Sequence, residues 1–388
     1  MPRAMCLAMT VLVLLVGPAP ADAGPDLGAN AALKYWQAFA TLPGFTAAEK
    51  DKLTAECLTM PLDAQARRSV AGAKYALDMM RRGAKLPRCD WAIGWADEGL
   101  FNRLPYLESA RVLSSLACLR ARLRFEEGQS ARATEDILAA MTLGRHVSLD
   151  GSLPSILTRY AIERCLGETL ARYLLRLDVG TLKDLNKDLG ALPAGGSLAT
   201  GVREEQILES GWYVRKVKEA EDHEAGLAVL SQLWGSREEG RVLLEECGGT
   251  PAGVVKYTEE LRSWYPQLAK QMELPLDQFE KEQERAAIKF AANPMYKRFV
   301  PGILRCRWHK AQADVWRALL SAALAVQLDG RDALKHHPDP VVGGPFDYVA
   351  FEGGFELRSK WKLDEKVQAK WKLDPPEPLV LTVGRRGQ

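Results

Sequence analysis

The chain has 388 residues, of which 47% are hydrophobic and 26% are charged, and its formal net charge is +2 at pH 7. This composition is typical of a globular protein and gives no basis for a disordered or fibrous chain. The small net charge argues against a protein that binds nucleic acid over its whole surface. The length suits two or three domains, or one large helical domain.

The N-terminus has the pattern of an export signal. Arg3 precedes an apolar run over residues 7–16, and Ala21-Asp22-Ala23 has the small residues of a signal peptidase site. The run is too short to span a bilayer, and no later run of about 18 uncharged apolar residues follows. We expect residues 1–23 to be a signal peptide, and the mature chain to be periplasmic or extracellular without a transmembrane segment.

Residues 24–335 are predicted to form a helical domain, because apolar residues recur at intervals of three and four between Gly, Pro and Asn breaks. Thr46 and Glu49 have the spacing of a capping box. The main expected helices cover residues 61–82, 106–127, 131–147, 154–177, 275–292 and 296–328. Residues 197–246 are expected to form one long polar helix, or two helices with a break near Gly235.

Small residues mark a helical hairpin similar to one tetratricopeptide unit. Ala121, Gly128, Ala133, Ile137 and Ala140 have the offsets at which small side chains let two helices approach closely. The pattern does not recur 34 residues later, as an array would require. We therefore expect one hairpin, extended by the helix near residue 154, and not a solenoid.

Six cysteines remain after the expected cleavage: Cys57, Cys89, Cys118, Cys165, Cys247 and Cys306. An even number in an exported protein permits disulfides, although buried free thiols are an equal alternative. No CxxC spacing occurs, so a zinc site is not expected. Cys118 and Cys165 should lie at similar heights on two parallel helices and be neighbours, bonded or packed. Cys57 with Cys89 is a second candidate pair.

The periodicity changes to two near the C-terminus. Residues 336–345 are predicted to be a linker, and residues 346–388 a small antiparallel β-meander packed on the last helix. The expected strands cover residues 346–351, 355–363, 366–373 and 379–383.

The pentapeptide KWKLD occurs twice in this region, from Lys360 and from Lys370. The alternation places Phe355, Leu357, Trp361 and Trp371 on the buried face of the sheet, and Glu356 on the opposite, solvent face. Basic side chains then occupy the solvent face and form a possible basic binding surface: Arg358, Lys360, Lys362, Lys366, Lys370 and Lys372. The simpler alternative is a solvated face that discourages aggregation between sheet edges.

An aromatic and acidic cluster lies in an irregular stretch between two helices: Asp90, Trp91, Trp95, Asp97 and Glu98. Tryptophan faces can stack on sugar rings, and a pair of carboxylates is what glycoside hydrolysis needs. The alternative is that both indoles fill the helical core while the acids cap the next turn. Buried indoles would remove the glycan hypothesis.

Several stretches resemble uncharacterised, predicted-secreted helical proteins that are abundant in planctomycete bacteria. The stretches are AALKYWQAFATLPGF, CDWAIGWADEGLFNRLPYLESARVL, LRARLRFEEGQSARATEDILAAMTLGRH, ALLSAALAVQLDG and GGPFDYVAFEGGFELRS. This resemblance implies export and a helical architecture, and no reaction.

The C-terminal segment is also similar, locally, to the β-region of type II secretion major pseudopilins. Asp339-Pro340, Gly343-Gly344, Phe346 and Tyr348 carry this likeness. A pilin-like assembly is not implied, because Gly44-Phe45-Thr46 is followed by a polar segment in place of a long apolar helix.

No complete catalytic motif is present: we find no Walker loop, no GxGxxG, no GxSxG and no HExxH. The sequence implies no cofactor and no metal. We expect a non-enzymatic exported protein with a protein-interaction or envelope-scaffold role, without nucleic acid as a partner. The alternative is a protein that binds or cleaves envelope glycans through the Asp90–Glu98 cluster.

Overall fold

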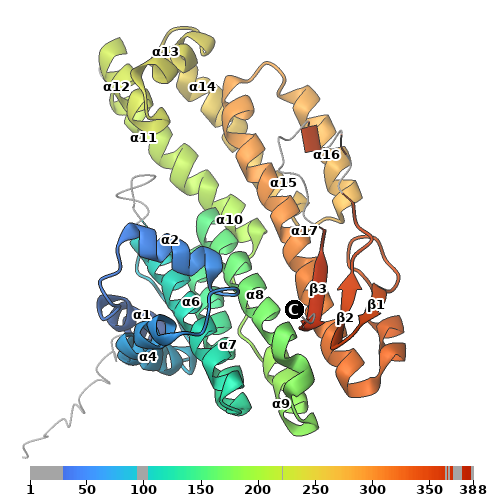
Figure 1. The fold of residues 1–388 in the computed structure, drawn as a ribbon. Helices are drawn as coiled ribbons and strands as arrows, with labels where there is room; N and C mark the ends of the chain where they lie inside the picture. The colour runs from blue at the N-terminus through green and yellow to red at the C-terminus, as the bar shows by residue number, and fades with distance from the viewer. Residues whose placement is uncertain are drawn as a thin grey trace, which may run out of the picture.

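The computed structural model describes residues 29–93, 104–220, 222–362 and 378–385, together with residues 365, 368 and 369. The protein is mainly helical, with a small three-stranded antiparallel sheet near the C-terminus, as the sequence predicted. Figure 1 shows the helices stacked along the length of the molecule, with the sheet lying against the long orange helix α17.

The first four helices are short: α1 (Ala31–Ala40), α2 (Ala47–Glu56), α3 (Ala64–Gly72) and α4 (Lys74–Ala84). The predicted capping box is confirmed, because Thr46 and Glu49 exchange hydrogen bonds at the start of α2. α1 and α4 pack closely, since a Cβ atom at Gly83 would come within 2.7 Å of the Tyr35 ring. Only glycine allows this approach without displacing the tyrosine.

The predicted hairpin is formed by α6 (Pro105–Glu126) and α7 (Ser130–Val147). Gly128 turns the chain with a φ of +72°, a conformation that favours glycine. Ala121, Ala133 and Ala140 are fully buried, as expected of residues between close helices. α8 (Leu153–Tyr173) packs on both helices and extends the hairpin into a three-helix layer.

The segment after α8 contains more helices than the sequence predicted. The polar region over residues 197–246 breaks at Gly235, whose φ is +76°, as the two-helix alternative predicted. It is also divided by a π-helical turn over Gln206–Gly211, which was not predicted. The helices of this part are α9 (Val179–Gly190), α10 (Leu198–Glu205), α11 (Trp212–Glu219), α12 (His223–Trp234) and α13 (Arg237–Glu246).

The remaining helices are α14 (Pro251–Arg262), α15 (Tyr265–Gln271), α16 (Leu276–Lys289) and the 36-residue α17 (Pro294–Asp329). Asn293 caps α17 by accepting hydrogen bonds from the backbone of Met295 and Tyr296. Pro301 lies inside the helix without ending it.

The helices enclose two hydrophobic cores. The first joins α1–α4, α6–α9, the C-terminal half of α17 and the sheet, and includes Leu116 and Leu319. The second joins α10–α16 with the N-terminal half of α17, and includes Phe279 and Trp308. α8 and α17 contribute buried residues to both cores and therefore connect them.

The sheet consists of β1 (Asp347–Phe351), β2 (Gly354–Arg358) and β3 (Val380–Gly384) in the order β1-β2-β3, with every pair antiparallel. Phe355 and Leu357 are buried on one face, together with Leu381 and Val383. This face packs on α8 as well as on α17.

Two details of the predicted meander are wrong. The strand expected over residues 355–363 ends at Arg358, where the Ser359 hydroxyl donates a hydrogen bond to Asp339 and accepts one from the backbone of Trp361. The strand expected over residues 366–373 is contradicted by Gln368 and Ala369, which have helical backbone. The last predicted strand is the third strand of the sheet.

Candidate functional sites

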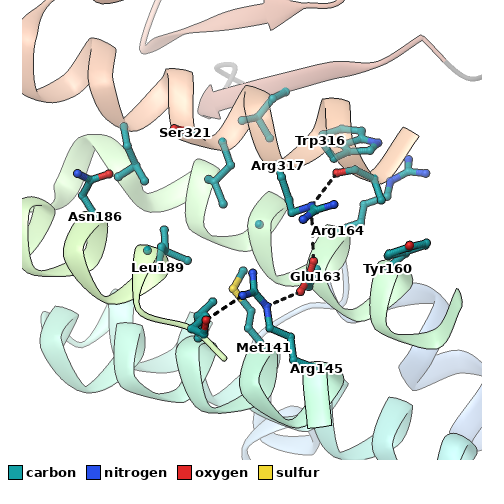
Figure 2. Close-up of a pocket in the computed structure, with 17 residues that line it drawn as sticks. Met141, Arg145, Tyr160, Glu163, Arg164, Asn186, Leu189, Trp316, Arg317 and Ser321 are labelled. Atoms are coloured by element: carbon teal, nitrogen blue, oxygen red, sulfur yellow. Dashed lines mark hydrogen bonds and ion pairs between the residues drawn. The ribbon is translucent and has the colours of Figure 1, made fainter. Parts of the chain in front are cut away.

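A cavity of about 260 Å³ lies where α7, α8, α9 and α17 meet below the sheet. Its walls are mostly apolar, and Figure 2 shows Met141, Leu189 and Trp316 on three of its sides. Cavities with mostly apolar walls and a smaller number of polar groups are typical of small-molecule sites.

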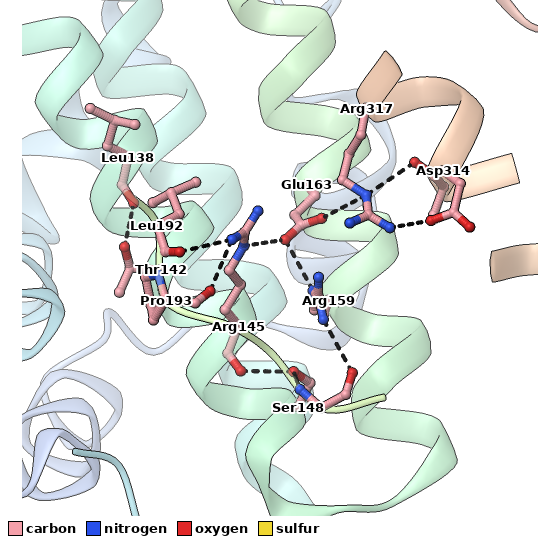
Figure 3. A network of polar contacts seen from close by, with 12 residues as sticks. Leu138, Thr142, Arg145, Ser148, Arg159, Glu163, Leu192, Pro193, Asp314 and Arg317 are labelled. Atoms are coloured by element: carbon pink, nitrogen blue, oxygen red, sulfur yellow. Dashed lines mark hydrogen bonds and ion pairs between the residues drawn. The ribbon is translucent and has the colours of Figure 1, made fainter. Parts of the chain in front are cut away.

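Glu163 is the acidic group of this cavity, and it is buried. Its Oε1 accepts hydrogen bonds from Arg145 Nε at 2.8 Å and from Arg159 Nε at 3.0 Å. Figure 3 shows both guanidinium groups directed at the carboxylate. Each arginine is fixed in turn by backbone carbonyls, Arg145 by Leu192 and Pro193.

The second oxygen of Glu163 lacks such a partner. Oε2 is buried and has no hydrogen-bond donor among the described residues, and Arg317 Nε lies 4.0 Å from it. Arg317 also forms an ion pair with Asp314, and Figure 3 shows its guanidinium between the two carboxylates. A buried carboxylate oxygen without a donor costs about 1–3 kcal/mol, so this position favours a ligand that donates a hydrogen bond.

The cavity opens beside α17, where the guanidinium of Arg164 stacks on the Trp316 ring at 4.9 Å from the ring centroid. The Arg317 side chain is 42% exposed and lies at the same opening. Three arginines and one glutamate therefore line the cavity, and the excess of positive charge disfavours a cationic ligand.

The predicted aromatic and acidic cluster is only partly described by the structure. Trp91 is buried, stacks on Tyr106 at 4.7 Å between ring centroids, and donates a hydrogen bond from Nε1 to the carbonyl of His146. Asp90 shapes a turn, since its Oδ1 accepts from Ala92 N and its backbone bonds to Asn30. The indole of Trp91 is thus a core residue and offers no face to a sugar.

Trp95, Asp97 and Glu98 lie outside the described residues. The part of the cluster that the structure places has the packing expected of a core, and it shows no paired carboxylates.

The predicted basic face is not a uniform surface. Arg358 is paired with Glu356, which is buried although the alternation placed it on the solvent face, and Lys360 is paired with Asp347 at 3.0 Å. Lys362 is exposed, and Trp361 is half-buried against both cores. Lys366, Lys370, Trp371 and Lys372 lie outside the described residues.

The side chains of three cysteines meet at a second candidate site. The Sγ atoms of Cys57, Cys118 and Cys165 all lie within 4.8 Å of one another, and Cys57 Sγ and Cys165 Sγ are 3.2 Å apart. The expectation that Cys118 and Cys165 are neighbours is therefore confirmed, as packed thiols, because the six described cysteines are all free. Cys57 joins this pair and does not pair with Cys89.

The three thiols differ in acidity. Hydrogen bonds from Cys118 and Cys165 lower the pKa of Cys57, and Ser115 and the charge of Arg122 act in the same direction. Hydrogen bonds with Cys118 and Cys57, together with burial, raise the pKa of Cys165. The hydrogen bond with Cys165 lowers the pKa of Cys118, but the bond with Cys57 and burial outweigh it and leave that pKa raised. Cys57 is thus the first of the three to become a thiolate.

Comparisons with models of protein families, with curated proteins and with solved structures find no match to this chain. Within the described ranges, none of the helices is both long and apolar enough to cross a membrane. The functional argument therefore depends on the geometry of the sites themselves.

The sequence did not indicate the cavity around Glu163, and of the cysteine cluster it predicted only the proximity of Cys118 and Cys165. Arg159 and Glu163 are four residues apart on α8, which is a recognisable helical ion pair. The other partners, Arg145 and Arg317, come from different helices and have no fixed spacing from Glu163. Wide spacing likewise concealed the convergence of the three cysteines.

Proposed function

We propose that this chain is a non-enzymatic binding protein that holds a small, mostly apolar molecule in the cavity around Glu163. The observation that carries the proposal is the buried Oε2 of Glu163, which accepts no hydrogen bond although Glu163 lines a cavity whose surface is mostly apolar. The ligand donates a hydrogen bond from an uncharged group such as a hydroxyl, because the neighbouring arginines repel an ammonium group.

The proposal also includes export of the chain from the cytoplasm. The N-terminal pattern expected to be a signal peptide would deliver the chain to the cell envelope, where such a protein would carry or sense amphipathic molecules. If the signal peptide is removed as expected, mass spectrometry of the exported protein should find a mature N-terminus at Gly24. An exported chain that still carries residues 1–23 would contradict the expected cleavage.

The binding proposal is tested with a matched pair of probes, 4-ethylphenol and 4-ethyltoluene, which differ in a hydroxyl and a methyl group. Titration calorimetry should show the phenol bound about tenfold more tightly, because only its hydroxyl can donate to Glu163 Oε2. The variant Glu163→Gln should reduce this ratio, since a neutral amide oxygen is a weaker acceptor than a carboxylate. Equal affinity for both probes would contradict the role of Glu163.

A second variant tests the cavity itself. Gly167 lines the cavity on α8, and a Cβ atom there meets Leu320 at an ordinary contact distance of 3.5 Å. Gly167→Leu should fill the space and abolish binding of both probes. Gly302→Leu is the matched control, because that helical glycine lies away from the cavity with nothing within 4 Å of an added Cβ. Loss of binding in the control, or retention in Gly167→Leu, would place the ligand elsewhere.

A role in binding other proteins of the envelope, expected from the sequence, stays a prediction. The burial of Trp91 argues against the glycan alternative, because other aromatic side chains cover the ring that would stack on a sugar.

A further inference from the structure

The three converging cysteines come from three separate helices. Cys57 ends α2, Cys118 lies in the middle of α6 and Cys165 lies in α8. Their sulfur atoms gather within a space 4.8 Å across, although 108 residues separate the first cysteine from the last. A disulfide would account for only two of these sulfurs, and the 3.2 Å between Cys57 and Cys165 is well beyond the bonded distance of about 2.05 Å.

The spacing of the sulfurs matches a three-coordinate metal site. A metal–sulfur distance of about 2.3 Å places the sulfurs of a trigonal site about 4 Å apart. The separations in this cluster run from 3.2 Å between Cys57 and Cys165 to at most 4.8 Å, so they bracket that value and each differs from it by no more than about 0.8 Å. A small side-chain adjustment would therefore suffice to hold an ion between the three sulfurs.

The donor set selects the kind of ion. All three donors are thiols, and no histidine or carboxylate belongs to the group among the described residues. Thiolates prefer soft cations, whereas structural zinc usually takes four ligands. Three sulfurs without a fourth protein ligand fit a cuprous ion best.

Surrounding residues support the cluster on its buried side. Cys118 is fully buried and lies 3.0 Å from Thr169 Oγ1. The Arg122 guanidinium, also buried, donates hydrogen bonds to the carbonyls of Cys57 and Met60. Its positive charge offsets part of the negative charge that three thiolates would leave around a monovalent ion.

The cluster is accessible from the other side. Cys57 and Cys165 line an open groove of about 530 Å³, together with Thr54, Leu58 and Trp316. Cys165 is partly exposed at the bottom of this groove. An ion can therefore reach Cys165 from solvent, with the buried Cys57 and Cys118 close behind it.

We propose that Cys57, Cys118 and Cys165 bind one cuprous ion in trigonal thiolate coordination. Binding releases the thiol protons to solvent and changes no oxidation state. None of the three cysteines lines the cavity around Glu163, so each proposal can fail without the other.

The test uses the full mature chain, reduced and kept free of oxygen, and titrated with Cu(I) against a competing chromogenic chelator. We expect one ion per chain, and X-ray absorption should show three sulfur neighbours at about 2.3 Å. Cys118→Ser and Cys165→Ser should each weaken binding at least 100-fold. Cys247→Ser and Cys306→Ser remove buried thiols elsewhere and should leave the affinity unchanged.

Circular dichroism checks that each variant is folded, and Cys165→Ser is the safer variant because Cys165 is only partly buried. Unchanged affinity in folded Cys165→Ser would overturn the proposal. So would a preference for Zn²⁺ with an additional oxygen or nitrogen ligand. A Cys57–Cys165 disulfide that persists in the chain isolated from its own compartment would also overturn it, because only one thiol would remain.

Discussion

At the residue scale, the decisive interactions join side chains that are far apart in the sequence. The capping box of Thr46 and Glu49 could be predicted, because both partners lie within one helical turn. The proximity of Cys118 and Cys165 could also be predicted, from the lengths of two helices. Glu163 could not be recognised as a site, because the sequence pattern does not report which arginine of another helix reaches it.

His146 illustrates how burial changes a single group. Its ring is buried beside Tyr35, whose hydroxyl lies 2.8 Å from Nδ1, and burial lowers the pKa of His146 from 6.5 to about 4. The folded state therefore keeps the imidazole neutral in a pH range where the unfolded chain protonates it.

The consequence is a stability that falls on acidification. Between pH 6.5 and pH 4 the unfolded state binds the extra proton, so the free energy of unfolding decreases as the pH falls through this window and is constant above it. From pH 7 to pH 5 the loss due to His146 should be about 2 kcal/mol. Urea denaturation at the two pH values measures it.

His146→Gln provides the control for this prediction, because the amide does not titrate. The variant should lose about 2 kcal/mol less stability between pH 7 and pH 5 than the natural chain does. The same pH dependence in both proteins would show that other groups cause it.

At the element scale, the sequence correctly predicted which regions of the chain are helical. It predicted less well where a long helical region divides into separate helices. Helices ended by Gly128 or begun by a capping residue appeared where the pattern placed them. In the polar region over residues 197–246 the break at Gly235 was predicted, whereas the division at Gln206–Gly211 was not. α9 has a signal that could have revealed it, since Asp178 caps a helix in which Leu182, Leu185 and Leu189 share one face.

The sheet was predicted from the local alternation of apolar and polar residues. The predicted length of its second strand was wrong because of packing between distant parts of the chain. Alternation correctly placed Phe355 and Leu357 on the buried face of β2. Period-two alternation could not reveal that Trp361 leaves the sheet to pack between the two cores.

Close helix packing gives a prediction at this scale. A Cβ atom at Gly240 of α13 would lie 2.8 Å from the backbone nitrogen of Ser231 on α12. Backbone atoms cannot rotate away as a side chain can, so Gly240→Ala should separate the two helices and cost about 1–3 kcal/mol of unfolding free energy.

The matched substitution Gly302→Ala should have the opposite sign. Position 302 is helical and has open space around an added Cβ, so alanine gains its helix propensity of about 1 kcal/mol without a clash. Denaturant unfolding of both variants gives the comparison. Stabilisation by Gly240→Ala would mean that α12 and α13 are not held this closely.

At the scale of the whole molecule, the two cores are the main feature that the sequence did not reveal. Apolar periodicity shows that a helix has a buried face, and it does not show which of two cores receives that face. The Glu163 cavity and the cysteine cluster both lie on α8, one of the two helices that contribute to both cores.

Two cores should give two levels of stability. Leu116 belongs to the first core and Phe279 to the second, and both side chains are fully buried. Leu116→Ala and Phe279→Ala should each cost about 2–5 kcal/mol. Because α8 and α17 are the main connections, we expect each loss to be concentrated in its own core.

Hydrogen exchange followed by mass spectrometry distinguishes the two cores. Leu116→Ala should accelerate exchange in peptides from α6 and α7 and leave α16 nearly unchanged, and Phe279→Ala should do the reverse. Equal loss of protection throughout the chain in both variants would show that α8 and α17 couple the cores into one cooperative unit. In that case a ligand bound beside Glu163 would stabilise the second core as strongly as the first.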